Sequence, residues 1–153
     1  MITIYCDGSC PKPNGVGGWA YVIIIPRLPE VFESGWSPLA TNQTMELYAA
    51  LRALRTVRGL QIRNEPLEIV SDSQYLVKGM MEWGEGWKAN NYEGIKNEDL
   101  WRRLHRHQVK CRALTFRWVK GHAGSTWNEE CDKMAGRAQR KGVETLANER
   151  KQS

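Results

Sequence analysis

The order of the predicted strands and helices constrains the fold of this chain more than any other feature. Three segments rich in β-branched and aromatic residues come first, at 2–6, 19–25 and 30–36, before any helical pattern. Helical and strand patterns then alternate. Strands joined directly pair antiparallel, whereas a helical crossover joins parallel strands. We therefore expect an α/β fold with a five-stranded mixed sheet, three antiparallel strands and then parallel strands, flanked by helices.

The clearest helix is predicted at 41–60, where Leu47, Leu51 and Leu54 recur at helical spacing. The remaining expected elements are a strand at 67–71, a helix that begins near 72, a short helical piece and a loop within 82–97, a helix at 98–109, a strand at 112–121 and a helix at 125–142. Residues 1–142 would form one domain. Residues 143–153 have little to bury, and we expect a flexible tail there.

Composition narrows the class of protein. The 153 residues are 41% hydrophobic and 25% charged, and no apolar run approaches the roughly 20 residues of a membrane helix. We see no signal peptide and expect a cytoplasmic protein, a monomer by default, with no membrane partner. The net charge of +5 favours a polyanionic partner.

Acidic residues fall where two parallel strands should end. Asp7 follows the first strand and Asp72 follows the strand at 67–71. Because the carboxyl ends of neighbouring parallel strands meet at one edge of a sheet, these side chains should converge. Glu46 lies in the first turns of the long helix, and Asp132 lies in the last helix. Each acid alone has a plainer role, as a turn former, a helix cap, a dipole partner or a solvated residue.

Together, several carboxylates without a set of His or Cys ligands repel one another. A hard divalent cation relieves that repulsion, and oxygen ligands suit Mg²⁺ or Mn²⁺. Two such ions can hold the attacking and the leaving oxygen of a phosphoryl displacement. In a basic protein, this pattern indicates cleavage of phosphodiester bonds.

Cys6 and Cys10 offer a different site, a zinc centre around a C-x3-C pair. No second pair of ligands follows at zinc spacing, so small buried hydrophobic side chains are the favoured interpretation. By strand alternation, Cys6 should point away from Asp7 and into the core.

Six short motifs, in order, resemble the type 1 ribonuclease H family (ribonuclease HI) over residues 1–141. They are YCDGSC, TNQTMELYAAL, IVSDSQYLVKGM, the pair Trp83 and Trp87, IKNEDLW and WVKGHAGSTWNEECDKMA. The resemblance implies the ribonuclease H fold and an endonuclease that hydrolyses the RNA strand of RNA/DNA hybrids, giving 5′-phosphate and 3′-hydroxyl ends. It also implies removal of RNA primers and R-loops.

The same resemblance implies roles for individual residues. Two Mg²⁺ ions, which Mn²⁺ could replace, would be held by Asp7, Glu46, Asp72 and Asp132. His122, between two glycines, would assist proton transfer or the release of product. The residues implied to contact the hybrid are Gly8, Asn14, Thr41, Asn42, Gln43, Gln74, Trp83, Trp87, Lys88 and Lys96. The segment after the Trp pair is short and holds only these two lysines, which predicts a modest salt dependence of binding.

Two other functions remain as alternatives. A nuclease of the same fold, of the exonuclease or resolvase type, would typically carry D-x-E in the first strand, whereas this chain has Asp7-Gly8-Ser9. A non-catalytic hybrid-binding domain would have lost metal ligands, yet the four acids and His122 are all present.

Overall fold

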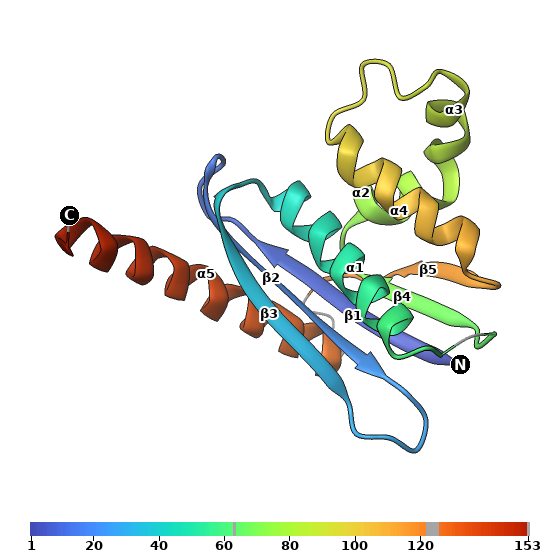
Figure 1. The fold of residues 1–153 in the computed structure, drawn as a ribbon, viewed down its shortest axis with the longest axis horizontal. Coiled ribbons are helices and arrows are strands. Elements are labelled where there is room, and N and C mark those ends of the chain that lie inside the picture. The colour runs from blue at the N-terminus through green and yellow to red at the C-terminus, as the bar shows by residue number, and fades with distance from the viewer. Residues whose placement is uncertain (63, 122–125, 153) are drawn as a thin grey trace.

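A single mixed sheet organises the computed structural model, which describes residues 1–62, 64–121 and 126–152 (Figure 1). The strands are β1 (Ile2–Ser9), β2 (Gly15–Ile24), β3 (Val31–Ala40), β4 (Leu67–Ser71) and β5 (Leu114–Trp118). Their order across the sheet is β3-β2-β1-β4-β5. The first three strands pair antiparallel, and β4 pairs parallel with both β1 and β5. The predicted five-stranded mixed sheet is confirmed.

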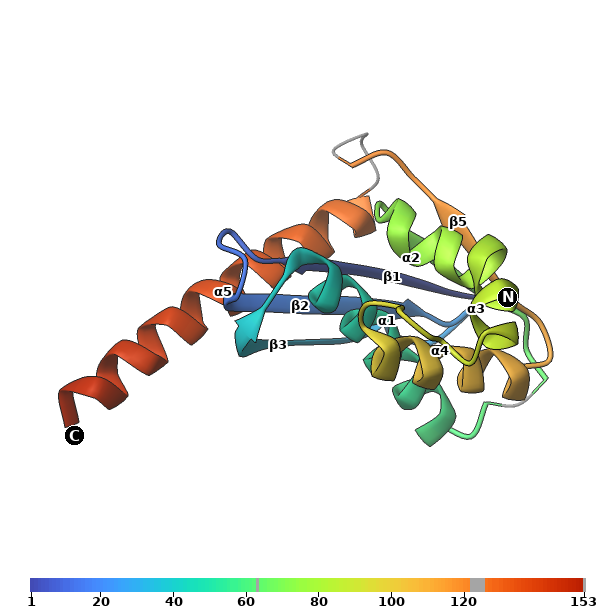
Figure 2. The same cartoon turned by 90° about the horizontal axis from the view of Figure 1, so that it is seen from above.

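Helices cover both faces of this sheet. They are α1 (Asn42–Gly59), α2 (Gln74–Lys78), the π-helix η1 (Gly79–Trp83), α3 (Gly84–Ala89), α4 (Glu98–Lys110) and α5 (Thr126–Gln152). Figure 2 shows α1 on one face of the sheet and α5 on the other, and α4 packs against α1. No helix within the described residues combines the length and apolar character that crossing a bilayer requires.

Strand β1 lies at the centre of the core. Ile2, Ile4 and Cys6 alternate along it and are fully buried, and Leu47 and Leu51 of α1 are buried in the same cluster. The prediction that Cys6 packs in the core is therefore confirmed. Helix α1 begins with a capping box, in which the hydroxyls of Thr41 and Thr44 accept from each other's backbone N–H groups.

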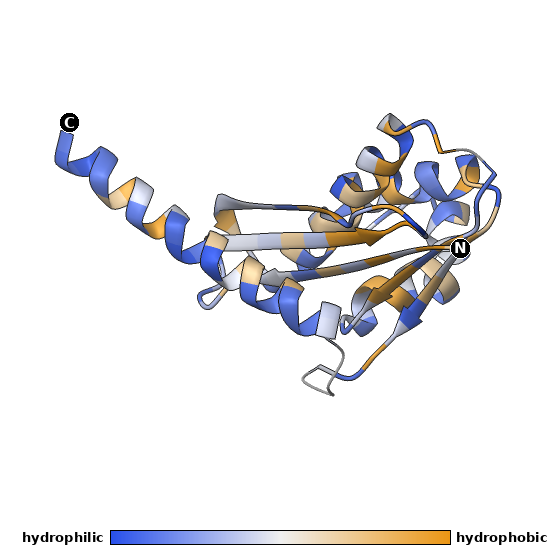
Figure 3. Cartoon of the chain, turned by 90° about the horizontal axis from the view of Figure 1, so that it is seen from below, coloured by the Kyte–Doolittle hydropathy of each residue, from blue (hydrophilic) through white to orange (hydrophobic). Residues whose placement is uncertain are grey.

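The predicted end of the last helix is wrong. Helix α5 does not stop at 142 but continues to Gln152, and Figure 3 shows this projecting end as mostly hydrophilic. The segment 143–152 holds no proline and is rich in good helix formers. The helix continues through Gly142. The lack of a side chain at this position allows close packing against β3, because a Cβ there would lie 2.7 Å from Cδ2 of Trp36.

Candidate active site

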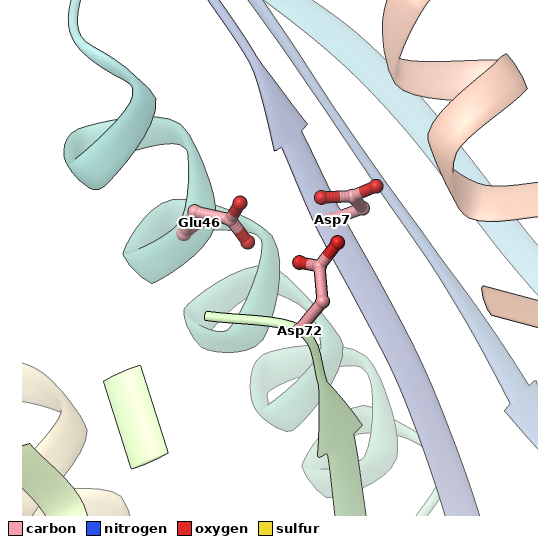
Figure 4. Close-up of side chains that lie close together, drawn as sticks. All are labelled: Asp7, Glu46 and Asp72. Carbon is pink, nitrogen blue, oxygen red and sulfur yellow. The ribbon is translucent and has the colours of Figure 1, made fainter. Parts of the chain in front are cut away.

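Three carboxylates converge at one edge of the sheet. Asp7 comes from β1, Glu46 from the second turn of α1, and Asp72 directly follows β4 (Figure 4). One oxygen from each of the three lies within 4.8 Å of the others. The parallel pairing of β1 with β4 brings Asp7 and Asp72 to the same edge, as predicted. However, β1 continues to Ser9, so that Asp7 lies within the strand and not at its exit.

Gly8 brings helix α1 and strand β1 close together. A Cβ on Gly8 would lie 2.6 Å from the backbone nitrogen of Glu46 and 2.7 Å from the Cβ of Met45. Only glycine therefore fits at this approach, which sets Glu46 beside Asp7. The backbone N–H of Gly8 also donates to Oδ1 of Asp7 at 2.8 Å, which fixes the orientation of that carboxylate.

Burial and mutual repulsion perturb these acids. The side chain of Asp7 is only 3% exposed, and burial, followed by the charge of Asp72, raises its pKa to about 7. Burial and the charges of Asp7 and Asp72 also raise the pKa of Glu46 well above its ordinary value. Oε2 of Glu46 is buried without a hydrogen-bond partner.

A divalent cation fits this cluster. Three acids that share one buried edge cannot all ionise at low cost, and a cation supplies the charge that the protein lacks there. The buried Oε2 of Glu46 is an acceptor without a donor, as a metal ligand is before the ion binds. Because all the donor atoms are carboxylate oxygens, the site suits a hard ion such as Mg²⁺ or Mn²⁺.

Asp132 lies apart from these three acids. It is exposed on α5 and does not belong to the cluster within 4.8 Å, although its charge contributes to the raised pKa of Asp7. Its neighbour Cys131 is buried, and Sγ of Cys131 donates to the carbonyl of Tyr5 at 3.4 Å. This contact fixes α5 beside β1, so Asp132 stands at the margin of the site.

Asn128 is a residue of this region to which our sequence reasoning gave no role. Its side chain is 2% exposed, and its Oδ1 is buried without a hydrogen-bond partner. It lies one turn before Asp132 on the buried stripe of α5, together with Cys131 and Ala135. The feature of the sequence that could have identified Asn128 is a polar residue within an otherwise apolar stripe of the helix. His122, predicted to assist proton transfer or the release of product, lies outside the described residues.

The predicted polar contacts to a hybrid surround the loop between β1 and β2 and the start of α1. Asn14 is exposed in this loop with a positive φ of 67°. Oδ1 of Asn42 accepts from the backbone N–H of Cys10 at 2.8 Å, which ties the loop to the helix. Gln43 is exposed at the first turn of α1, and Gln74 is exposed at the start of α2.

The two tryptophans of the predicted groove differ in environment. Trp83 ends η1 and is 42% exposed, and Nζ of Lys78 lies 6.0 Å from its ring centroid. Trp87 in α3 is partly buried, with its ring edge-on to Trp101 at 5.0 Å. The two rings are 5.9 Å apart. Trp83 is therefore available to a ligand, whereas Trp87 mainly supports it.

The predicted basic contacts follow this pair in the chain. Lys88 in α3 forms a salt bridge with Glu85 at 3.2 Å, and Lys96 is exposed in the following loop. The cation that the structure does place over the exposed ring is Lys78 of α2.

The chain is similar to known ribonucleases H over most of its length. The RNase H family model matches residues 1–140. A ribonuclease H of Rhodopirellula baltica is 40% identical over 145 residues, covering 88% of this chain and 87% of the relative. Ribonuclease HI of Caulobacter vibrioides is 39% identical over 142 residues, with coverage of 88% and 89%.

Solved structures of ribonucleases H have the same fold as this chain. LC9-RNase H1, a type 1 RNase H with the type 2 active-site motif, superposes with a TM-score of 0.78 at 28% identity, covering 90% of this chain and 71% of that one. LC11-RNase H1, solved in complex with RNA/DNA hybrid, gives a TM-score of 0.74 at 18% identity, with coverage of 94% and 99%. The chain belongs to the ribonuclease H family of endoribonucleases.

Proposed function

We propose that this protein hydrolyses the RNA strand of RNA/DNA hybrids with two divalent ions, leaving 5′-phosphate and 3′-hydroxyl ends. The observation that carries this proposal is the cluster of buried Asp7 with half-buried Glu46 and Asp72, in which one oxygen of each lies within 4.8 Å of the others. Removal of RNA primers and R-loops by a cytoplasmic monomer is the cellular role that we infer for it.

Asp7, Glu46 and Asp72 would hold Mg²⁺, with Asp132 completing the set from α5. The bound ions would supply the positive charge that activates the attacking water and stabilises the leaving oxygen, and Mn²⁺ could replace them. The hydrogen bond from the backbone N–H of Gly8 to Oδ1 of Asp7 orients this carboxylate. Asp7 is buried, and the low local dielectric around it strengthens its attraction for a cation.

The polar residues around the cluster would select the substrate. The exposed side chains of Asn14, Gln43 and Gln74 provide amide donors and acceptors, as recognition of a 2′-hydroxyl in a minor groove requires. Asn42 contributes by fixing the loop of Asn14 against α1, through its bond to the backbone of Cys10. Gly8 would allow close approach of the backbone to the hybrid.

Further contacts would hold the RNA/DNA hybrid beside the carboxylate cluster. Thr41, whose hydroxyl caps α1, would contact a phosphate at this helix N-terminus. The exposed ring of Trp83, supported by Trp87, would line the groove, and Lys88 and Lys96 would neutralise phosphates. His122 would assist proton transfer or the release of product.

Cleavage of three labelled substrates tests the proposal. We expect the purified protein with Mg²⁺ to cut a 5′-labelled RNA internally when it is paired with DNA, and to leave single-stranded RNA and duplex DNA intact. EDTA should abolish the cleavage, and so should Asp72→Asn, because the cluster then loses a charged ligand. Equal cleavage of all three substrates would contradict the assignment, and hybrid binding without cleavage would indicate a non-catalytic domain.

A further inference from the structure

A concave surface lies between helix α5 and the edge strand β3, on the face of the sheet opposite to α1 (Figure 2). We call it the α5–β3 cleft, and its volume is about 420 Å³. It is lined by Ser34, Gly35 and Trp36 of β3 and by Arg137, Ala138 and Lys141 of α5. The cleft therefore brings one aromatic ring together with two cations.

Helical geometry turns this cleft away from the carboxylates. Arg137 and Lys141 lie five and nine residues beyond Asp132 on α5. At about 1.5 Å per residue, this places them roughly 8–14 Å along the helix from Asp132. At about 3.6 residues per turn, nine residues make two and a half turns, so Lys141 lies on the opposite side of the helix from Asp132. The cleft is therefore separate from the proposed hydrolytic site.

The ring of Trp36 is held by the backbone of α5. A Cβ on Gly142 would lie 2.7 or 2.8 Å from Cγ, Cδ2 and Cε3 of Trp36. Because these three ring atoms are almost equally distant, Gly142 lies against the face of the indole and not against its edge. Trp36 nevertheless stays partly exposed and lines the cleft. An aromatic ring fixed at a concave surface is a platform on which a planar group can stack.

Strand β3 presents a second ring on the same face of the sheet. Its pairing with β2 is regular over residues 31–37, so the alternate side chains of Phe32, Ser34 and Trp36 face α5. Phe32 is 63% exposed, and its ring is available to a ligand. Four residues of strand separate the Cα atoms of the two aromatic residues by roughly 13 Å. This face of the edge strand therefore carries two rings with a hydroxyl between them.

The two cations of the cleft belong to a row of positive charges on α5. Lys133, Arg137 and Lys141 recur at four-residue spacing, and all three are exposed. Like charges at this spacing repel one another on a helix. Within the described part of the chain, Arg137 and Lys141 form no salt bridge. An anionic ligand would relieve the repulsion, and two neighbouring cations could contact successive phosphates of one strand.

We propose that the α5–β3 cleft binds single-stranded nucleic acid, with bases stacked on Trp36 and Phe32 and phosphates held by Arg137 and Lys141. Sequence-tolerant binding of single strands combines aromatic rings with a positively charged groove, as this surface does. A duplex keeps its bases paired and stacked, so it does not offer them to these rings. An acidic peptide would contact the two cations without requiring the rings. Binding here goes beyond the proposed hydrolysis, because it does not use the carboxylates.

Binding of a labelled oligonucleotide tests the proposal. The probe is a single-stranded DNA of 12 thymidine nucleotides, measured by fluorescence anisotropy at 100 mM salt in EDTA, so that no divalent ion supports hydrolysis. A matched abasic oligonucleotide keeps the phosphates and lacks the bases. A ten-residue peptide of Asp residues represents the competing class of ligand.

The charge variants are two matched double neutralisations. Arg137→Gln with Lys141→Gln changes the cleft, and Arg106→Gln with Lys110→Gln makes the same change of two charge units at exposed positions of α4. We expect the cleft variant to bind the DNA at least tenfold more weakly, and the α4 variant to stay within about twofold. The slope of log affinity against log salt should fall by about 1.4 in the cleft variant, because two phosphate contacts are lost.

The aromatic variants separate stacking from charge. We expect Trp36→Ala and Phe32→Ala each to weaken DNA binding at least about fivefold with an unchanged salt slope, because a stacked base is lost. Trp36 packs on Gly142 and contributes to folding, whereas the exposed ring of Phe32 does not, so Phe32→Ala remains decisive if Trp36→Ala fails to fold. The abasic probe should bind the unmodified protein at least fivefold more weakly than the DNA and should not distinguish it from Phe32→Ala.

Three results would overturn the proposal. The first is absence of DNA binding, or an equal loss in the cleft and α4 variants, which would indicate non-specific attraction to a basic protein. The second is displacement of the DNA by the Asp peptide as effectively as by unlabelled DNA, which would indicate a protein partner. The third is loss of cleavage of a blunt-ended RNA/DNA hybrid in the cleft variant, which would place the cleft in the substrate groove. Unchanged hybrid cleavage supports a separate site.

Discussion

Replacing Asp7 by Asn should stabilise the metal-free protein while abolishing its activity. The pKa of Asp7 rises from 3.8 to about 7 because the carboxylate is buried beside Asp72. Between these pH values the folded protein holds a proton that the unfolded chain releases, so stability falls as pH increases. The difference of about three pH units corresponds to at most about 4 kcal/mol, lost by pH 8.

Asparagine removes this cost without changing the shape of the side chain. Its Oδ1 can still accept the hydrogen bond from Gly8, which Asp7 accepts at 2.8 Å. We therefore expect Asp7→Asn to unfold at a higher temperature than the unmodified protein in EDTA at pH 8, by at most about 8–16 °C, because 1 kcal/mol shifts Tm by about 2–4 °C at this size. Thermal unfolding followed by circular dichroism measures this difference.

Two further measurements test whether the higher Tm of Asp7→Asn arises from the ionisation of Asp7. The advantage of Asp7→Asn should shrink as pH is lowered from 8 towards 4, since the folded protein then holds the proton on Asp7 and the unfolded chain begins to take it up as well. Mg²⁺ should also reduce it, because the ion stabilises the unmodified protein more than the variant. Asp132→Asn, at an exposed position, is the control and should alter stability by no more than about 0.5 kcal/mol. A gain of Asp7→Asn that is the same at pH 4 and pH 8, or a loss, would refute the reasoning.

Three other perturbations have distinct outcomes. Gly8→Ala places a Cβ against the backbone of Glu46 and should destabilise the protein by about 1–3 kcal/mol, with loss of cleavage, as denaturant titration and hybrid assays would show. Trp83→Ala should raise KM for hybrids about fivefold with little change in kcat, because about 1 kcal/mol of contact is lost at an exposed ring. Deletion of 143–153 should change Tm and hybrid cleavage little, because this end of α5 is mostly exposed.

The sequence predicts the acidic cluster because strand topology determines it. Once β1 and β4 are joined through a helix, their parallel pairing places Asp7 and Asp72 at one edge, whatever the details of packing. The depth of burial could not be predicted, since it depends on how closely α1 approaches β1 at Gly8. Burial and the charge of Asp72, which raise the pKa of Asp7, likewise follow from the tertiary structure.

Features that depend on packing between distant segments were beyond sequence reasoning. Gly142 looked like a helix end, but its lack of a side chain accommodates Trp36 of β3. Trp87 shares a spacing of four with Trp83, yet it packs on Trp101 of α4, a helix that begins eleven residues later. The contact between α1 and α4 is likewise long-range, and no local pattern in either helix shows it.

The placement of Asp7 on the central strand explains how the fold tolerates its buried carboxylate. Strand β1 is paired on both sides and covered by α1 and α5, so its position is determined by contacts that do not involve Asp7. Cys6 and Cys131, both fully buried, pack next in sequence to Asp7 and Asp132. The apolar contacts of these neighbours stabilise the backbone that carries each acid. The unfavourable burial of the carboxylates is therefore offset by the surrounding core and remains available to favour binding of a cation.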